Sequence, residues 1–96
     1  MTELLTPKLE ALCAAAVEYE ASDLLFHEGR IPQFRLESGL TPLECEPLPA
    51  EFFDALWAAC GAGDQHDYDA SLTVGGVRFR VNLLRQLGLR AAVLRR

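Results

Sequence analysis

The chain has 96 residues, of which 50% are hydrophobic and 24% are charged, a composition typical of a single globular domain. Its net charge of −5 disfavours a general nucleic-acid binder. No apolar run approaches the ~20 residues that cross a bilayer, and the N-terminus lacks the pattern of a secretory signal, so we expect neither a membrane span nor secretion.

The first predicted element is a helix over residues 7–20. Thr6 suits the N-cap, and Pro7 suits the first helical position, where its missing N–H costs nothing. Apolar residues at spacings of three and four form one face, comprising Leu9, Leu12, Cys13, Ala16 and Val17. We expect this face to pack across a sheet.

Two or three short strands are predicted next, over residues 23–27 and 32–37 and, as the short third one, 40–43. Leu24 and Phe26 share one face of the first strand. Turns at Gly29 and Gly39 separate the strands, and Pro42 suits a strand at the edge of a sheet. The short connections predict antiparallel neighbours.

A second helix is predicted over residues 49–59, with Gly61 as the residue that follows its C-cap. Its wide apolar face carries Phe52, Phe53, Leu56, Trp57 and Cys60. Such an aromatic cluster is far more often core than a ligand cage.

The last third of the chain predicts a β-hairpin followed by a further strand. Residues 68–74 and 77–84 alternate in polarity on both sides of Gly75-Gly76, the strongest short-range hairpin signal. Phe79 and its apolar neighbours should face the core, whereas Arg78, Arg80 and Asn82 should face the other way. A loop holding Arg85, Gln86 and Gly88 should lead into a strand over residues 89–94. The fold class is therefore α+β, with one antiparallel sheet and helices packed on one face.

Charge divides the chain at residue 70. Residues 1–69 hold all fourteen acidic residues and three basic ones, a balance of −11, whereas residues 70–96 hold six arginines and no acidic residue. Arginine is favoured where planar, bidentate contact with phosphate or carboxylate matters. The arginines therefore indicate either an acidic partner or a solvated face that the acidic remainder of the domain neutralises.

The residues show no catalytic constellation and no recognisable metal or nucleotide motif. Asp64, His66, Asp67 and Asp69 lack the order of a calcium loop and are expected to be polar turn residues. The three cysteines contain no C-x-x-C pair, which disfavours a disulfide framework or a zinc site and suits a reducing compartment. Phe79 alternates with the arginines, so the interleaved aromatic and basic face of a single-strand binder is missing.

The order of several short motifs resembles the N-terminal domain of the PilT-type type IV pilus retraction ATPases, the twitching-motility motors, which are similar to the type II secretion ATPases. The resemblance runs from about Ala21 to Arg96. It is carried by Ala21-Ser22-Asp23-Leu24, Gly29, Arg35-Leu36-Glu37, Asp67-Tyr68, Arg78-Phe79-Arg80-Val81-Asn82 followed by Gln86, and Ala91-Ala92-x-Leu94-Arg95.

The resemblance implies a PAS-like domain that precedes a RecA-like ATPase core in a bacterial, hexameric motor. On that basis residues 1–96 are expected to be the single N-terminal domain without the core. The chain itself would hold no cofactor and would not be an enzyme, and ATP and Mg²⁺ would belong to the parent protein. Its partners would be the ATPase core of the same or a neighbouring subunit and the pilus machinery, at the cytoplasmic face of the inner membrane.

Specific residues follow from the same resemblance. Arg78, Arg80 and Arg95, together with Asn82 and Gln86, are expected at the nucleotide or the subunit interface. The remaining motif residues, expected to be structural, are Ala21, Ser22, Asp23, Gly29, Arg35 and Asp67. Leu25 stands where the family usually has histidine, a difference that suits a diverged paralogue. The alternative function is a free-standing PAS-like adaptor or sensor that binds a protein or a small ligand.

Overall fold

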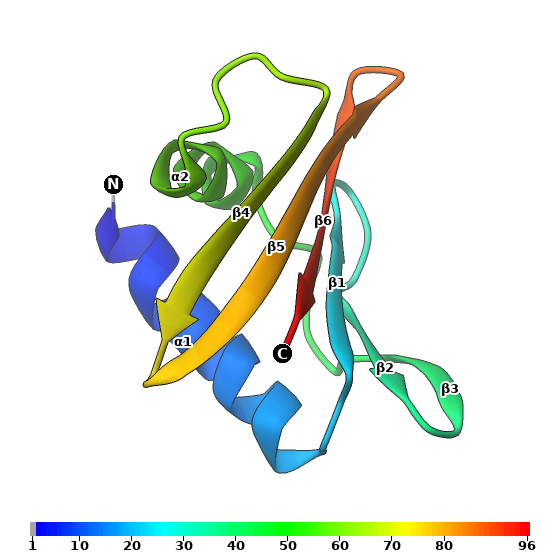
Figure 1. Cartoon of the computed structure of the whole chain (residues 1–96). Coiled ribbons are helices and arrows are strands. Elements are labelled where there is room, and N and C mark those ends of the chain that lie inside the picture. Colours follow the sequence, from blue (N-terminus) through cyan, green and yellow to red (C-terminus); the bar gives the residue numbers. More distant parts are fainter. Residues whose placement is uncertain (1) are drawn as a thin grey trace.

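A computed structural model describes residues 2–96, with side chains from Pro7 onward. One helix, three strands, a second helix and three further strands follow one another, as predicted (Figure 1). The elements are α1 (Thr2–Glu18), β1 (Asp23–His27), β2 (Gln33–Leu36), β3 (Gly39–Pro42), α2 (Ala50–Cys60), β4 (Asp67–Val74), β5 (Val77–Gln86) and β6 (Leu89–Arg95). Within this part of the chain no helix is long and apolar enough to cross a membrane.

The strands form one six-stranded sheet in the order β3-β2-β1-β6-β5-β4, in which every neighbouring pair is antiparallel. Two three-stranded meanders, β1–β2–β3 and β4–β5–β6, meet where β1 pairs with β6. Both helices lie on the same side of the sheet (Figure 1). The predicted α+β class is confirmed, and the arrangement is consistent with a PAS-like domain.

The core lies between the helices and the covered face of the sheet. Because side chains alternate along a strand, β5 buries Phe79, Val81 and Leu83, which are every second residue along its middle. Helix α2 contributes the predicted aromatic face of Phe52, Phe53 and Trp57. Helix α1 contributes the predicted stripe that includes Cys13, and burial raises the pKa of that thiol to about 12.

The prediction for the start of the first helix was wrong. Helix α1 begins at Thr2, so Thr6 lies inside it and Pro7 is an interior residue rather than the first one. Glu3, Leu4 and Leu5 are good helix formers, and the helix continues through Pro7 without the one hydrogen bond that an N–H there would donate.

The two helices end in the same way. Gly61 follows α2 with φ 72°, as predicted, and the N–H groups of Gly61 and Ala62 bond back to the last turn. After α1, which ends two residues earlier than expected, Glu20 adopts φ 57° and Ala21 donates to the Ala16 carbonyl. The residue with left-handed backbone conformation, which is usually glycine, is thus Gly61 after α2 but Glu20 after α1.

The loop predicted between the last two strands is shorter than expected. Arg85 and Gln86 belong to β5, and only Leu87 and Gly88 form the turn. Both turn residues have positive φ, 54° and 79°, as do Gly75 and Gly76 in the β4–β5 turn. Two such residues match the right-handed twist of antiparallel strands, and the whole of β6 pairs with β5 from Arg80 to Gln86.

Candidate functional site

The candidate site lies on the open face of the sheet, the face opposite the helices. Register places four residues side by side across four neighbouring strands: Arg80 on β5, Arg95 on β6, Asp23 on β1 and Arg35 on β2. We call these four residues the arginine row. Their side chains share one face because directly opposite residues in antiparallel strands point the same way.

Asp23 anchors the arginine row. Its side chain is only 2% exposed. One oxygen accepts a hydrogen bond from Arg95 Nε at 2.7 Å, and the other lies 3.0 Å from Arg35 Nε in an ion pair. Burial by itself would raise the pKa of Asp23, but the bond from Arg95, a bond from Ser22 and the two positive charges outweigh it and hold the pKa below its ordinary value. The carboxylate is therefore ionised and fully engaged inside the domain.

The residues before Asp23 fix its position. Ala21 is buried in the connection between α1 and β1, and the Ser22 N–H donates to the Arg35 carbonyl at 2.9 Å. The Ser22 hydroxyl donates to the Asp23 carboxylate at 3.0 Å. The Ala-Ser-Asp motif thus turns the chain from helix to strand and places one carboxylate between two arginines.

Arg80 is the member of the row that Asp23 does not reach. It lies directly opposite Arg95, and among residues 7–96 no ion pair includes Arg78 or Arg80. Like charges directly opposite each other across a strand pair are destabilising. The row therefore holds three guanidinium groups and one carboxylate that pairs with two of them, which leaves an excess of positive charge in the row.

A shallow hollow of about 390 Å³ adjoins these groups, lined by residues that include Arg80, Arg95, Asp69 and Val93. Asn82 lies at its side, but its amide already donates to Asp67 at 3.0 Å and to Asp69 at 2.8 Å. Asn82 is therefore engaged within the domain, and the cationic groups beside the hollow are Arg80 and Arg95.

The other predicted residues lie farther away. Arg78 lies two residues before Arg80 on β5 and so outside the arginine row. Its guanidinium makes a long contact of 3.4 Å with the Ser71 hydroxyl. Gln86 is at the opposite end of β5, and Gly29 adopts φ 83° in the turn after β1. The fold thus gathers Arg80, Arg95, Asn82, Asp23, Arg35 and Asp67 on one face and leaves Gln86 and Gly29 away from them.

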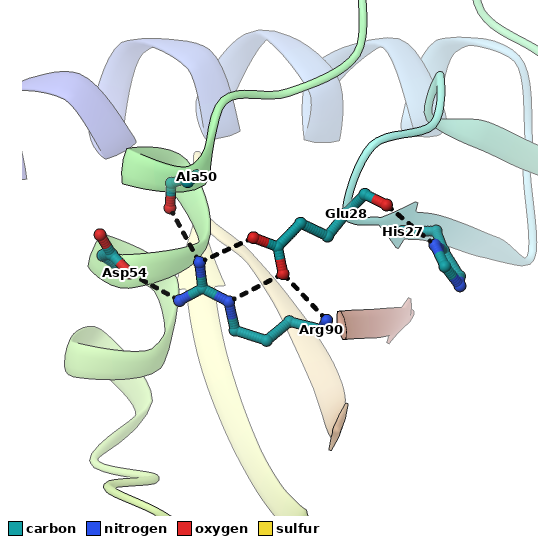
Figure 2. Close-up of polar contacts among 5 residues, drawn as sticks. All are labelled: His27, Glu28, Ala50, Asp54 and Arg90. Carbon is teal, nitrogen blue, oxygen red and sulfur yellow. Dashed lines mark hydrogen bonds and ion pairs between the residues drawn. The ribbon is translucent and has the colours of Figure 1, made fainter. Parts of the chain in front are cut away.

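A second polar cluster, centred on Arg90, was not predicted. Figure 2 shows its guanidinium between Glu28 and helix α2. It donates to both Glu28 oxygens, at 3.1 and 3.0 Å, and to Asp54 at 2.6 Å. The same group lies over the rings of Phe53 and Trp57 at 5.6 and 5.7 Å.

Electrostatics and burial make the Arg90 cluster a structural clamp. The bond from Arg90 holds the pKa of Glu28 below its ordinary value, and the bond to Glu28 raises the pKa of Arg90. The sequence did carry a signal for it, since Arg90 has the same phase as the buried Ala92 and Leu94 and so had to face the core side.

The chemistry available on the open face is electrostatic docking. Among the described residues no group of three or more His, Cys, Asp or Glu is placed to hold a metal ion. The exposed arginines can instead bind carboxylate or phosphate oxygens bidentately.

Comparison with known proteins supports the resemblance seen in the motifs. No family model matches this sequence, and none of the curated proteins is similar to it. Among solved structures the pilus retraction motor PilT, crystallised with bound ADP, matches at 26% identity with a TM-score of 0.75, over 91% of this chain. The chain has the fold of a PilT-type N-terminal domain. It spans 28% of the length of that PilT chain.

Proposed function

We propose that this chain is the assembly and regulatory domain of a PilT-type ATPase. Its open face docks on the RecA-like ATPase core of its own or a neighbouring subunit in a hexameric ring, and so couples the domain to the nucleotide state. The core, not this domain, binds ATP and Mg²⁺, and the motor works at the cytoplasmic face of the inner membrane. The likeness to PilT over 91% of the chain supports this proposal.

The observation that carries the proposal is the unequal charge balance of the arginine row. Arg35 and Arg95 share Asp23, whereas Arg80 has no carboxylate among the described ion pairs. Arg78 extends the same positive surface. An acidic surface or a phosphate on the ATPase core would supply the missing counter-charge and would guide the encounter.

The test is a binding measurement between this chain and the ATPase core of a PilT-type protein, by calorimetry at two salt concentrations. We expect Arg78→Ala/Arg80→Ala to weaken binding about tenfold or more and to reduce its salt dependence. Arg30→Ala is the matched control, because Arg30 is exposed in the turn between β1 and β2. Repeating the titration with ATP-loaded and ADP-loaded core measures the coupling. Equal binding by the double variant and the wild type would contradict the proposal.

A second candidate is the sensor function, favoured by an apolar groove between α1 and the β2–β3 hairpin. The groove has a volume of about 510 Å³, and its lining includes Tyr19, Phe34, Leu36 and Leu43. A small apolar ligand would fit its lining. Ala15→Trp would fill the groove from α1, so a ligand that raises the melting temperature of the wild type should not raise that of the variant.

A further inference from the structure

The outer edge of β4 presents unpaired backbone groups. In the two-residue hairpin, Val74 and Val77 form the hydrogen-bonded pair next to the turn, and bonded pairs then recur at every second residue. The N–H and C=O groups of Asp67, Asp69, Ser71 and Thr73 consequently point away from β5. No backbone hydrogen bond in the described chain outside the β4–β5 ladder uses them.

This edge lacks several of the features by which proteins prevent strand pairing, although it carries the charges of Asp67 and Asp69. β4 has 8 residues in regular register with β5, with no proline, lysine or bulge. The opposite edge, β3, has 4 residues and ends at Pro42, at a position whose backbone points outward and would otherwise present an N–H group.

We propose that β4 pairs antiparallel with β4 of a second copy of this chain, about a two-fold axis through Ala70. The two sheets then form one continuous sheet. In this register Asp69 lies opposite Ser71 of the second copy, and Asp67 lies opposite Thr73. All four outward-pointing residues of each copy find partners, which gives about eight new backbone hydrogen bonds.

Charge on the open face fits this register. The acidic residues Asp67 and Asp69 occupy the first half of β4, and the small residues Ser71 and Thr73 occupy the second half, beside Arg80 and Arg78. An antiparallel two-fold brings the first half of one strand against the second half of the other. Each arginine then has a carboxylate of the second copy about two strand spacings away, roughly 10 Å between Cα atoms, across a small residue.

Two observations indicate that the arginine side chains can reach the second copy and that the partner is another copy of this chain. Arg78 already reaches from β5 onto the edge strand β4, where its guanidinium lies 3.4 Å from the Ser71 hydroxyl. Arg80, which has no described ion pair, gains Asp69 of the second copy, and Asp69 keeps its bond from Asn82 of its own chain. The surface is therefore complementary to itself.

The helix side of the edge fits as well. In the proposed register Tyr68 of the second copy lies opposite Leu72, beside a cavity of about 150 Å³ whose lining includes Leu9, Leu72 and Val74. Tyr68 and Leu72 are both half-buried in the single chain. The tyrosine ring would fill this cavity and bury apolar surface on both copies.

The test is sedimentation equilibrium of the 96-residue chain at concentrations up to about 1 mM, which detects even weak pairing. We expect a dimer whose population rises with concentration. Ser71→Pro removes an outward N–H without touching the β5 ladder, so we expect it to weaken dimerisation about tenfold or more. Leu40→Pro is the matched control, since Leu40 holds an outward position on the β3 edge. A wild-type chain that stays monomeric, or a Ser71→Pro variant that dimerises like the wild type, would overturn the proposal.

A charge exchange keeps the test decisive if the proline disturbs folding. Arg80→Asp should weaken the dimer about tenfold, and adding Asp69→Arg should restore it, because each copy then offers the reversed pair. Arg80→Asp without effect, or no restoration by the double variant, would count against the register.

Pairing through β4 does not rest on docking to an ATPase core: Ser71→Pro leaves every arginine in place, so loss of the dimer with core binding retained would separate the two proposals.

Discussion

The two meanders of the sheet differ in strand length, in charge and in how their outer edges end. The β1–β2–β3 meander has strands of 5, 4 and 4 residues and closes its edge with Pro42. The β4–β5–β6 meander has strands of 8, 10 and 7 residues, carries the arginines and leaves its edge unprotected. Self-pairing is thus blocked on one edge and open on the other, which suggests that the long meander faces partners while the short one completes the core.

Ion pairs between the meanders lie at both ends of the β1–β6 ladder, and we call this ladder with its ion pairs the seam. Arg95 binds Asp23 at one end on the open face. Arg90 binds Glu28 at the other end, on the side of the helices. Each pair joins residues more than 60 positions apart in sequence, so the ion pairs hold together halves that no local turn connects.

The largest effect should follow from breaking the buried end of this seam. Arg90→Ala would leave Glu28 and Asp54 without their cation and would uncover Phe53 and Trp57, so we expect a loss of about 3 kcal/mol in unfolding free energy. Urea denaturation measures it. Arg30→Ala, on an exposed turn, should change stability by less than about 0.5 kcal/mol. A loss below about 1 kcal/mol for Arg90→Ala would show that the aromatic packing holds the seam alone.

The open-face end of the seam should be weaker, because its arginines are largely exposed. Asp23→Asn removes the shared charge and should cost about 2 kcal/mol by the same urea measurement. It should also leave Arg35, Arg80 and Arg95 without any carboxylate in their row. Asp64→Asn, the same change on an exposed loop, serves as the control and should be nearly neutral. Equal effects of the two variants would mean that Asp23 contributes nothing specific to the seam.

Acid should loosen both ends of the seam together. Asp23 and Glu28 have lowered pKa values in the folded chain, so the unfolded chain takes up protons first as pH falls. Their stabilisation is complete above the ordinary carboxyl pKa of about 4 and is lost as pH falls through the folded values. We expect unfolding free energy measured from pH 6 to pH 2 to fall by on the order of 1 kcal/mol more in the wild type than in Asp23→Asn/Glu28→Gln. Parallel curves for the two proteins would exclude these groups as the cause.

The smallest effect concerns the β5–β6 turn, which is formed by Leu87 and Gly88 instead of two glycines. Leu87 is 95% exposed and has φ 54° in the β5–β6 turn, where Asn is preferred before Gly. Leu87→Asn should raise the unfolding free energy by about 0.5 kcal/mol, as a rise in melting temperature would show. Gly75→Asn at the equivalent place in the β4–β5 turn should be close to neutral. A destabilised Leu87→Asn would indicate that the leucine packs against something.

Local pattern allowed much of the fold to be predicted. The class, the order of elements, the Gly75-Gly76 hairpin and the direction of Phe79 relative to Arg80 all follow from alternation and turn chemistry, which act between near neighbours. The start of α1 was missed because a favourable position for Pro7 outweighed the helix propensity of the residues before it. The Arg90 clamp was missed because its two carboxylates come from distant elements.

The sequence by itself determined which face of β5 each side chain occupies and which end of the chain is basic. Both follow from the two-residue period of a strand and from the order of residues along it. Only the tertiary structure decided that β1 lies beside β6, since that pairing joins residues more than 60 positions apart and depends on the packing of the whole core. That pairing gives Asp23 to Arg35 and Arg95, leaves Arg80 without an ion pair among residues 7–96, and makes β4 an edge.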